Sequence, residues 1–274
     1  MFVNNYKKQP GFTLIEIAVV LVLVGLLLGS FIGSVTQRIE TSQRENTKKQ
    51  LADIKTALLG FASARGRLPC PTTTTGNGNE QPVGGSTLVT PCTLQHGFIP
   101  GKTLGVIGTY NRDNLLEDVW GNPIRYSVTT NNNNAFTTAY TVPFAGGIKD
   151  VGMANLQPDL VICDADSGLN SVCSAGVKTI ILGTPFVVIS LGKDGSDFVT
   201  NLAPNSDQGE NSGEAAVAAN AGGENVAYTV GSGNAFVSKT YSSVDSAAGL
   251  FDDLIIWESP YIIYSRMMEA GQLP

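Results

Sequence analysis

Residues 7–29 read KKQPGFTLIEIAVVLVLVGLLLG and contain the most hydrophobic run of the chain. From Ile17 to Gln37 the chain carries no charge, and Arg38 ends the run. At about 1.5 Å per residue, a helix of that length roughly matches the hydrocarbon core of a bilayer. Glu16 lies at one end of this apolar run. A carboxylate in such a segment costs ~2–3 kcal/mol at full depth and less near the interface, so the sequence predicts a partner for it.

Two common explanations of an apolar N-terminus, a cleavable secretion signal and a plain membrane anchor, do not account for all features of this segment. A cleavable secretion signal has an apolar region of roughly 7–15 residues, followed by a small-x-small cleavage site. Here the run is longer, and Gly33-Ser34-Val35 is a poor substitute for such a site. A plain transmembrane anchor fits the length but gives no reason for Glu16.

The hexapeptide Gly11-Phe12-Thr13-Leu14-Ile15-Glu16, with two lysines before it, closely resembles the cleavage motif of type IV pilins and type II secretion pseudopilins. The resemblance implies that residues 1–11 are a leader, that a prepilin peptidase cuts between Gly11 and Phe12, and that Phe12 is then N-methylated. It also implies that Glu16 pairs with the terminal ammonium of a neighbouring subunit during assembly. An ammonium in the same low-dielectric layer relieves the cost of both charges. The competing interpretation is an anchor with a tolerated interfacial glutamate.

The apolar segment also contains glycines at helical spacing, Gly25, Gly29 and Gly33. This doubled Gly-x-x-x-Gly pattern lets helices approach closely, so we expect these glycines to serve helix packing. The competing interpretation is that they only weaken the helix, by roughly 1 kcal/mol each relative to alanine. The two interpretations do not exclude each other.

One long helix is expected from about Thr13 to Ala64. After a polar stretch at 40–50, apolar residues return with the i, i+3, i+4 spacing of a helix that lies on a core, at Leu51, Ile54, Leu58 and Phe61. We therefore expect residues 12–37 to form a transmembrane and filament-core helix. Residues 38–66 are expected to form the amphipathic second half of the same helix.

The remainder, residues 67–274, has the composition of a globular β-rich head with long loops. Only 15% of the residues of the chain are charged and 31 are glycine, which argues against a charge-rich helical domain. Short runs rich in β-branched and aromatic residues predict strands at 124–130, 136–142, 160–163, 178–182, 186–191, 226–230 and 254–257. Together with the resemblance, this predicts an α+β, pilin-like fold with the long N-terminal helix packed on an antiparallel β-sheet head.

The four cysteines, Cys70, Cys92, Cys163 and Cys173, fall into two local pairs. Four cysteines allow three connectivities, and we favour Cys70–Cys92 and Cys163–Cys173 because these close the shortest loops. Neither pair has Cys-x-x-Cys spacing and His96 is the single histidine, so a zinc site is not expected. Disulfides behind a membrane-targeting segment indicate an oxidising compartment.

Three segments of the head resemble ordered landmarks of the major pseudopilin of type II secretion: EDVWGNPIRY at 117–126, ISLGKDG at 189–195 and DDLIIW at 252–257. In that family the last two surround a calcium ion. The resemblance makes Asp194, Asp252 and Asp253 candidate ligands, since hard carboxylate oxygens suit calcium. The long separation of Asp194 from Asp252 departs from the family pattern and leaves the other ligands unidentified. The alternative is a hairpin turn at Asp194-Gly195, with the two later acids capping or flanking a strand.

Composition and motifs argue against several functions. The net charge is −6, the pI is near 4.8 and no basic patch is present, so nucleic-acid binding is not expected. The sequence has one histidine, no Gly-x-Ser-x-Gly elbow, no Walker loop and no Rossmann fingerprint, so we do not expect an enzyme. No cofactor is required, and Ca²⁺ is the candidate ion.

The expected function is that of a structural subunit, pseudopilin or pilin-like, of a type II secretion or type IV pilus filament. Its expected partners are the prepilin peptidase, other pilin or pseudopilin subunits, the inner-membrane assembly platform and membrane lipids. The expected location is the inner membrane, with a single span and the head in the periplasm, and later a periplasmic or extracellular filament. The alternative is a minor tip pilin whose enlarged head binds a surface, DNA or a secreted substrate.

Overall fold

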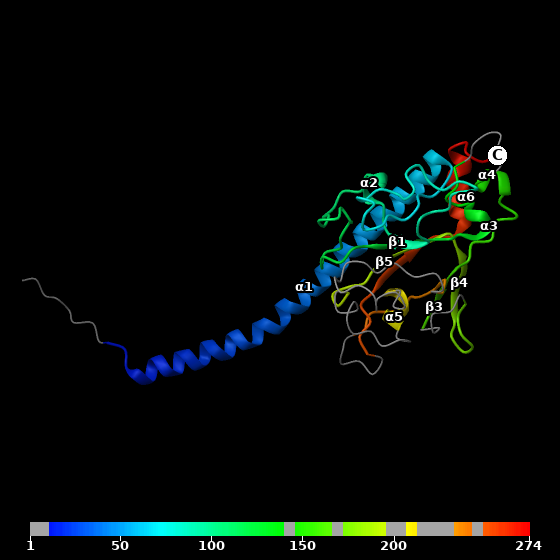
Figure 1. The fold of residues 1–274 in the computed structure, drawn as a ribbon. Helices are drawn as coiled ribbons and strands as arrows, with labels where there is room; N and C mark the ends of the chain where they lie inside the picture. Colours follow the sequence, from blue (N-terminus) through cyan, green and yellow to red (C-terminus); the bar gives the residue numbers. More distant parts are fainter. Residues whose placement is uncertain (1–10, 140–145, 166–171, 196–206, 213–232, 243–248) are drawn as a thin grey trace, which may run out of the picture. The chain divides into compact units, whose positions relative to one another are not determined.

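The computed structural model describes residues 11–139, 146–165, 172–195, 207–212, 233–242 and 249–274, without the side chains of residues 28–37, 210 and 212. The chain divides into two compact units, residues 1–45 and residues 46–274, and each is described by itself (Figure 1). The second unit holds both sheets and the described short helices.

Helix α1 (Leu14–Arg65) passes through both units. No proline interrupts it, and apolar residues fill most of its first half. The helix ends where Gly66 takes a left-handed conformation (φ 72°) and donates its N–H to the carbonyl of Ala62 at 2.9 Å. Glycine adopts this conformation without a Cβ clash. The helix predicted for residues 13–64 is therefore present with nearly the same ends.

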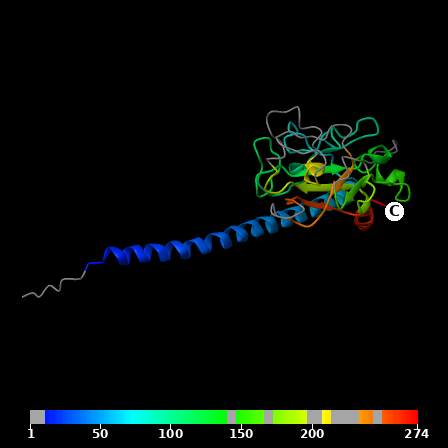
Figure 2. The ribbon, with the colours of Figure 1, turned by 90° about the horizontal axis from the view of Figure 1, so that it is seen from below.

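The larger sheet has four antiparallel strands in the order β1-β2-β5-β7. These strands are β1 (His96–Phe98), β2 (Arg125–Val128), β5 (Phe186–Ser190) and β7 (Leu254–Trp257). One face of the sheet packs on the second half of α1 (Figures 1 and 2), where Leu51, Ile54 and Leu58 share a buried core with Tyr126 and Val188. The α+β class, with an N-terminal helix and an antiparallel sheet, is confirmed.

A second, three-stranded sheet packs on the other face. Its strands are β3 (Leu160–Cys163), β4 (Thr179–Thr184) and β6 (Ala235–Val237), in the order β4-β3-β6, with β3 antiparallel to β4 and parallel to β6. Val187 and Ile189 of β5 share a second core with Leu160, Ile162 and Phe236. Because β5 is covered on both faces, all of its residues are buried, which explains its unbroken apolar run.

Short helices complete the described part: α2 (Gly101–Leu104), α3 (Asn131–Asn134), α4 (Ile148–Val151), α5 (Asp207–Ser212) and α6 (Pro260–Glu269). Ser259 caps α6 by accepting the N–H of Tyr261, and Pro260 suits the first helical position. In α3, Asn132 and Asn133 have φ of 54° and 55°, so this segment is a left-handed turn and not a true helix.

Most of the predicted strands are present. The runs predicted at 124–130, 160–163, 178–182, 186–191 and 254–257 correspond to β2, β3, β4, β5 and β7. In the run at 136–142 the described residues form a turn and one isolated bridge from Thr138 to Ser86, so that strand prediction is wrong there. Residues 140–142 and the run at 226–230 lie outside the described residues. The sequence does not predict β1 and β6, because strands of three residues show no clear alternation.

Candidate functional site

The first turn of α1 closes on Glu16. Its Oε2 atom accepts hydrogen bonds from the backbone N–H and the hydroxyl of Thr13, both at 2.9 Å. The N–H of Glu16 donates to Thr13 Oγ1 at 3.4 Å. This reciprocal pair is a capping box, which satisfies free donors at the start of a helix. In the single chain the partner of Glu16 is thus Thr13. The Thr-x-x-Glu spacing indicates this contact, whereas the expected partner was the ammonium of a neighbouring subunit.

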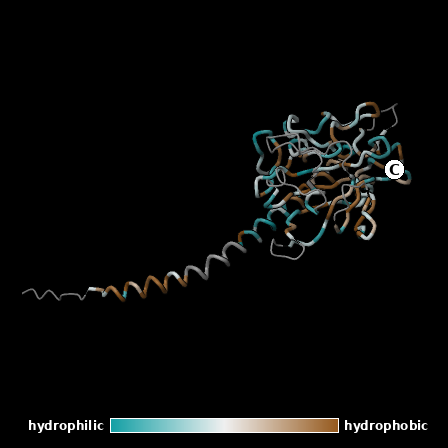
Figure 3. The backbone as a smooth tube through the Cα atoms, turned by 60° about the horizontal axis from the view of Figure 1, so that its bottom comes forward, coloured by the Kyte–Doolittle hydropathy of each residue, from teal (hydrophilic) through white to brown (hydrophobic). Residues whose placement is uncertain are grey.

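From Phe12, just before α1, to Leu27, apolar side chains are exposed on all sides. Phe12 is 83% exposed and Leu14 is 87% exposed, and the apolar residues that follow, up to Leu27, are exposed as well. Figure 3 shows this stretch as the brown part of the helix. A helix that is apolar all round is normally covered by other helices or by a membrane. This part of the chain is therefore a surface suited to assembly.

Two expectations for this helix concern the packing role of its glycines and its ability to span a membrane. Gly25 has no atom within 4 Å of the position of a Cβ, so another helix could approach closely there. Gly29 and Gly33 lie outside the residues whose surroundings are described. No helix in the described part of the chain has both the length and the apolar character needed to cross a membrane.

The landmark segments of the head lie next to one another. Asp118 Oδ1 accepts the N–H groups of Trp120 and Asn122, both at 2.9 Å, which fixes the turn before β2. Asp118 Oδ2 accepts the hydroxyl of Ser190 at 2.6 Å, and the Asn122 amide donates to the carbonyl of Gly192 at 2.6 Å. Burial raises the pKa of Asp118. These contacts hold the segments at 117–126 and 189–195 together, although about 70 residues separate them.

The third landmark joins them through Asp252. Its Oδ2 atom accepts the N–H of Lys193 at 2.6 Å, and its Oδ1 atom accepts the side-chain amide of Gln208 at 2.8 Å. The same amide contacts both oxygens of Asp194 at 3.4 Å. Burial, and then the adjacent carboxyl of Asp252, raise the pKa of Asp194 to about 8. Gly192 (φ 70°) allows this approach, since a Cβ there would lie 2.5 Å from the Asp252 carboxyl carbon.

Asp253 is held separately by α5. Its Oδ2 atom accepts the amide of Asn211 at 2.8 Å, while its buried Oδ1 atom has no hydrogen-bond partner. Burial raises its pKa well above the usual range. Within the described residues, no three His, Cys, Asp or Glu side chains form a group that could hold a metal ion. The carboxyl groups of Asp194 and Asp252 are adjacent, but the expected set of three ligands is not brought together among these residues, and calcium binding stays a prediction.

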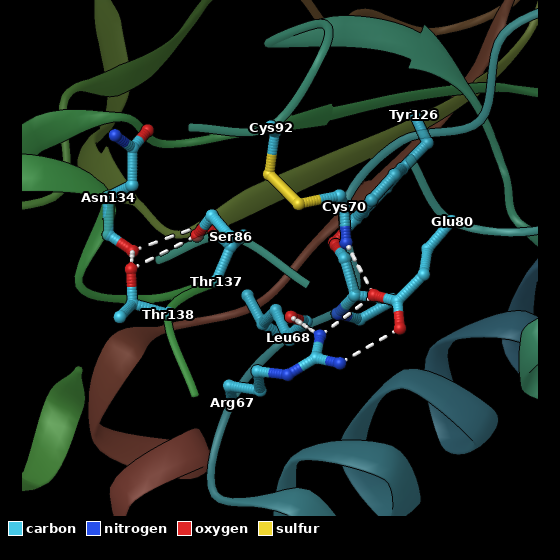
Figure 4. The surroundings of a disulfide bond; sticks show 11 residues. Arg67, Leu68, Cys70, Glu80, Ser86, Cys92, Tyr126, Asn134, Thr137 and Thr138 are labelled. Atoms are coloured by element: carbon cyan, nitrogen blue, oxygen red, sulfur yellow. Dashed lines mark hydrogen bonds and ion pairs between the residues drawn. A yellow bond between two sulfur atoms is a disulfide. The ribbon is translucent and has the colours of Figure 1, made fainter. Parts of the chain in front are cut away.

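The cysteines pair as Cys70–Cys92 and Cys163–Cys173, the connectivity favoured from the sequence. Figure 4 shows that the first disulfide lies beside a buried ion pair. Arg67 and Glu80 form two hydrogen bonds of 2.8 Å, and each side chain is only 6% exposed. Glu80 also accepts the N–H of Cys70 at 3.2 Å. The disulfide and the ion pair together fix the loop between α1 and β1.

A groove of about 340 Å³ lies between α1 and the loops before β2. Its lining contains the charged residues Lys49, Asp53, Glu117 and Asp118, with Ile107 almost fully exposed beside them. The groove is thus lined by charged, polar and apolar side chains together.

The comparisons with known proteins concern the N-terminus. Residues 6–32 match the family described as the prokaryotic N-terminal methylation motif. The match includes Gly11, Phe12 and Glu16. Neither the comparison with curated proteins nor the comparison with solved structures gave a match.

Proposed function

We propose that this chain, a type IV pilin-like protein by its methylation motif, is a structural subunit of a type II secretion or type IV pilus filament. The motif is the signature of type IV pilins and pseudopilins, and it implies processing by a prepilin peptidase and assembly with other pilin subunits. One observation carries the proposal: the cleavage residues, Glu16 and an exposed apolar helix follow one another within residues 11–27. Such a subunit is not an enzyme.

The subunit is anchored in the inner membrane before it assembles. The uncharged sequence from Ile17 to Gln37 supports this location, and the leader lysines favour a cytoplasmic N-terminus. The two disulfides support a head in the oxidising periplasm. The same apolar helix then contacts lipids, the assembly platform and finally the neighbouring subunits in the filament.

The head favours type II secretion over a pilus. The segments at 117–126, 189–195 and 252–257 resemble those of the major pseudopilin, and they contact one another here. Calcium binding by Asp194 and Asp252 belongs to this proposal. It is supported by two adjacent carboxylates whose mutual repulsion a cation would relieve.

A minor tip pilin is the second candidate. The three-stranded sheet adds a layer on the face of the main sheet that α1 does not cover, and the groove beside Ile107 offers a further surface. A head enlarged in this way suits recognition of a surface, DNA or a secreted substrate. A screen of the purified chain for binding these ligands would separate a tip pilin from a major subunit.

The decisive experiment compares Glu16→Ala with Thr13→Ala. Both changes break the capping box, but only the first removes the carboxylate that would pair with the Phe12 ammonium of a neighbour. Intact mass should first show a mature chain that begins at N-methyl-Phe12. Crosslinking to other pilin subunits should then fall sharply for Glu16→Ala and remain for Thr13→Ala, with equal amounts of both proteins in the membrane fraction.

Two results would contradict the proposal. A chain that keeps Met1 in cells with an active prepilin peptidase is not processed as a pilin. Equal loss of crosslinking in both variants would mean that Glu16 acts through the helix cap within its own chain.

A further inference from the structure

His96 lies at the junction of the two sheets. It belongs to β1, at the edge of the four-stranded sheet, and only 5% of it is exposed. Its Nδ1 atom is hydrogen-bonded to Ser127 Oγ on β2 at 2.9 Å. Its ring centroid is 6.0 Å from that of Phe236 on β6, which belongs to the three-stranded sheet. The single histidine of the chain therefore contacts both sheets.

A chain of polar contacts surrounds this ring at the start of β6. The side chain of Asn234 is a hydrogen-bond partner of His96, and it also accepts the amide of Gln95 at 2.9 Å. Asn234 donates to Asp159, before β3, at 3.0 Å, and Asp159 in turn accepts the hydroxyl of Thr129. These contacts join the end of the four-stranded sheet to the beginning of both β3 and β6.

The other end of β6 is joined in a different way. Asn211 of α5 binds the backbone of Val237 through both its oxygen and its amide, and it also donates to Asp253. The three-stranded sheet is thus held by His96 at one end and by Asn211 at the other. Burial already raises the pKa of Asp253, so acid favours the neutral form that its surroundings prefer.

The charge that acid would place on His96 would be buried in the closed structure. Burial lowers the pKa of His96 from 6.5 to about 4, and the hydrogen bond to Asn234 opposes only part of this effect. Among the described residues, Arg125 is on the same face of β2 as Ser127, and Asp159 is joined to the ring through Asn234. β6 contributes no titratable residue.

We propose that His96 forms an acid-sensitive contact between the two sheets. When its ring becomes a cation, the three-stranded sheet opens from the four-stranded sheet at the β1–β6 end, while the four-stranded sheet stays packed on α1. The smaller sheet opens first because its core is small and is distinct from the core on α1. Opening brings the apolar face around Phe236 into contact with solvent, so acid creates a surface that neutral pH hides.

The direction and size of the effect follow from proton linkage. The folded pKa is below the unfolded value, so the closed sheets are fully stable above pH 6.5 and lose stability as pH falls toward 4. A pKa of 6.5 in the open form and about 4 in the closed form means that the open form binds the proton about 300-fold more tightly. The ratio of open to closed molecules can therefore rise by up to about 300-fold well below pH 4, and by about half of that factor at pH 4.

The two tryptophans report on the two cores separately. Trp257 packs against the core between the sheets, and Trp120 packs against the core on α1. Full-length chain in detergent would be prepared as Trp120→Phe, which leaves Trp257, and as Trp257→Phe, which leaves Trp120. Between pH 7 and 4, acrylamide quenching should rise strongly for Trp257 and stay nearly constant for Trp120. In a His96→Gln background, which keeps a polar but neutral side chain, the rise at Trp257 should be lost.

A second measurement needs no substitution. Because His96 is the single histidine, its ring carbon signals in ¹³C-histidine-labelled chain are assigned directly, and their titration should share its midpoint with the quenching of Trp257. Three outcomes would overturn the proposal. The first is a simultaneous rise in quenching at both tryptophans, which would indicate global unfolding. The second is protonation of the His96 ring without any change in the quenching of Trp257. The third is an acid transition that persists in His96→Gln and disappears in Asp159→Asn.

Discussion

Replacing Glu80 by glutamine tests how the head is held together beside its first disulfide. In the wild type, Arg67 and Glu80 share two hydrogen bonds of 2.8 Å, and each side chain is 6% exposed (Figure 4). Glu80→Gln keeps the shape but leaves the buried guanidinium without a counter-charge. Removing one member of a buried ion pair costs about 3–5 kcal/mol, a large part of the ~5–15 kcal/mol that stabilises a typical domain.

The assay is urea unfolding of the full-length, oxidised chain in detergent. The matched control is Glu269→Gln, which breaks the Arg266–Glu269 pair on α6, where the side chains are 58% and 63% exposed. An exposed pair contributes at most about 1 kcal/mol. The double variant Arg67→Met with Glu80→Leu should be more stable than Glu80→Gln alone, because it leaves no buried charge unpaired. If Glu80→Gln costs no more than Glu269→Gln, the reasoning is refuted.

Three further predictions concern the head. Replacing the Cys163–Cys173 disulfide by two serines should lower the free energy of unfolding by about 3 kcal/mol, measured by urea unfolding, if loop closure dominates. Gly192→Ala should destabilise the head clearly more than Gly105→Ala. Both glycines have positive φ, but only at Gly192 would the Cβ meet the carboxylate of Asp252. Equal melting temperatures of the two variants would contradict this. Because the pKa of Asp194 in the folded chain is raised to about 8, its protonated form contributes to the free energy of unfolding. This contribution is fully present below pH 4 and is lost as pH rises through 8. Asp194→Asn, melted in EDTA, should therefore be the more stable protein at pH 9 and should lose that advantage at pH 4.

The predictions for the N-terminal segment depend on signals that are local in the sequence. The cleavage motif and the position of Glu16 are read within six residues, and the matching family covers the same stretch. The capping contact of Thr13 is equally local, since Thr-x-x-Glu is a known helix-start pattern. The cysteine pairing also followed from short loop lengths. In each case the chain connects the interacting residues over a short distance.

The acidic site of the head could be predicted only in part. The landmark segments pointed to Asp194, Asp252 and Asp253. Their sequence did not show that Gln208 donates hydrogen bonds to Asp194 and Asp252, or that Asn211 donates one to Asp253. Both amides come from α5, a short polar helix without an apolar pattern. Side chains brought together by long-range packing leave no periodic signal in the chain.

The long helix, its apolar first half, the methylation motif and most of the strands can be predicted from the chain alone, because they depend on periodicity and composition within a few turns or a few residues. Packing between distant segments sets how those strands are arranged. It placed β3, β4 and β6 as a second sheet over the apolar residues Val187 and Ile189 of β5, and so turned a helix-on-sheet head into three layers. Burial of both faces of β5 drove this arrangement, and it is also what encloses the one histidine of the chain between two sheets.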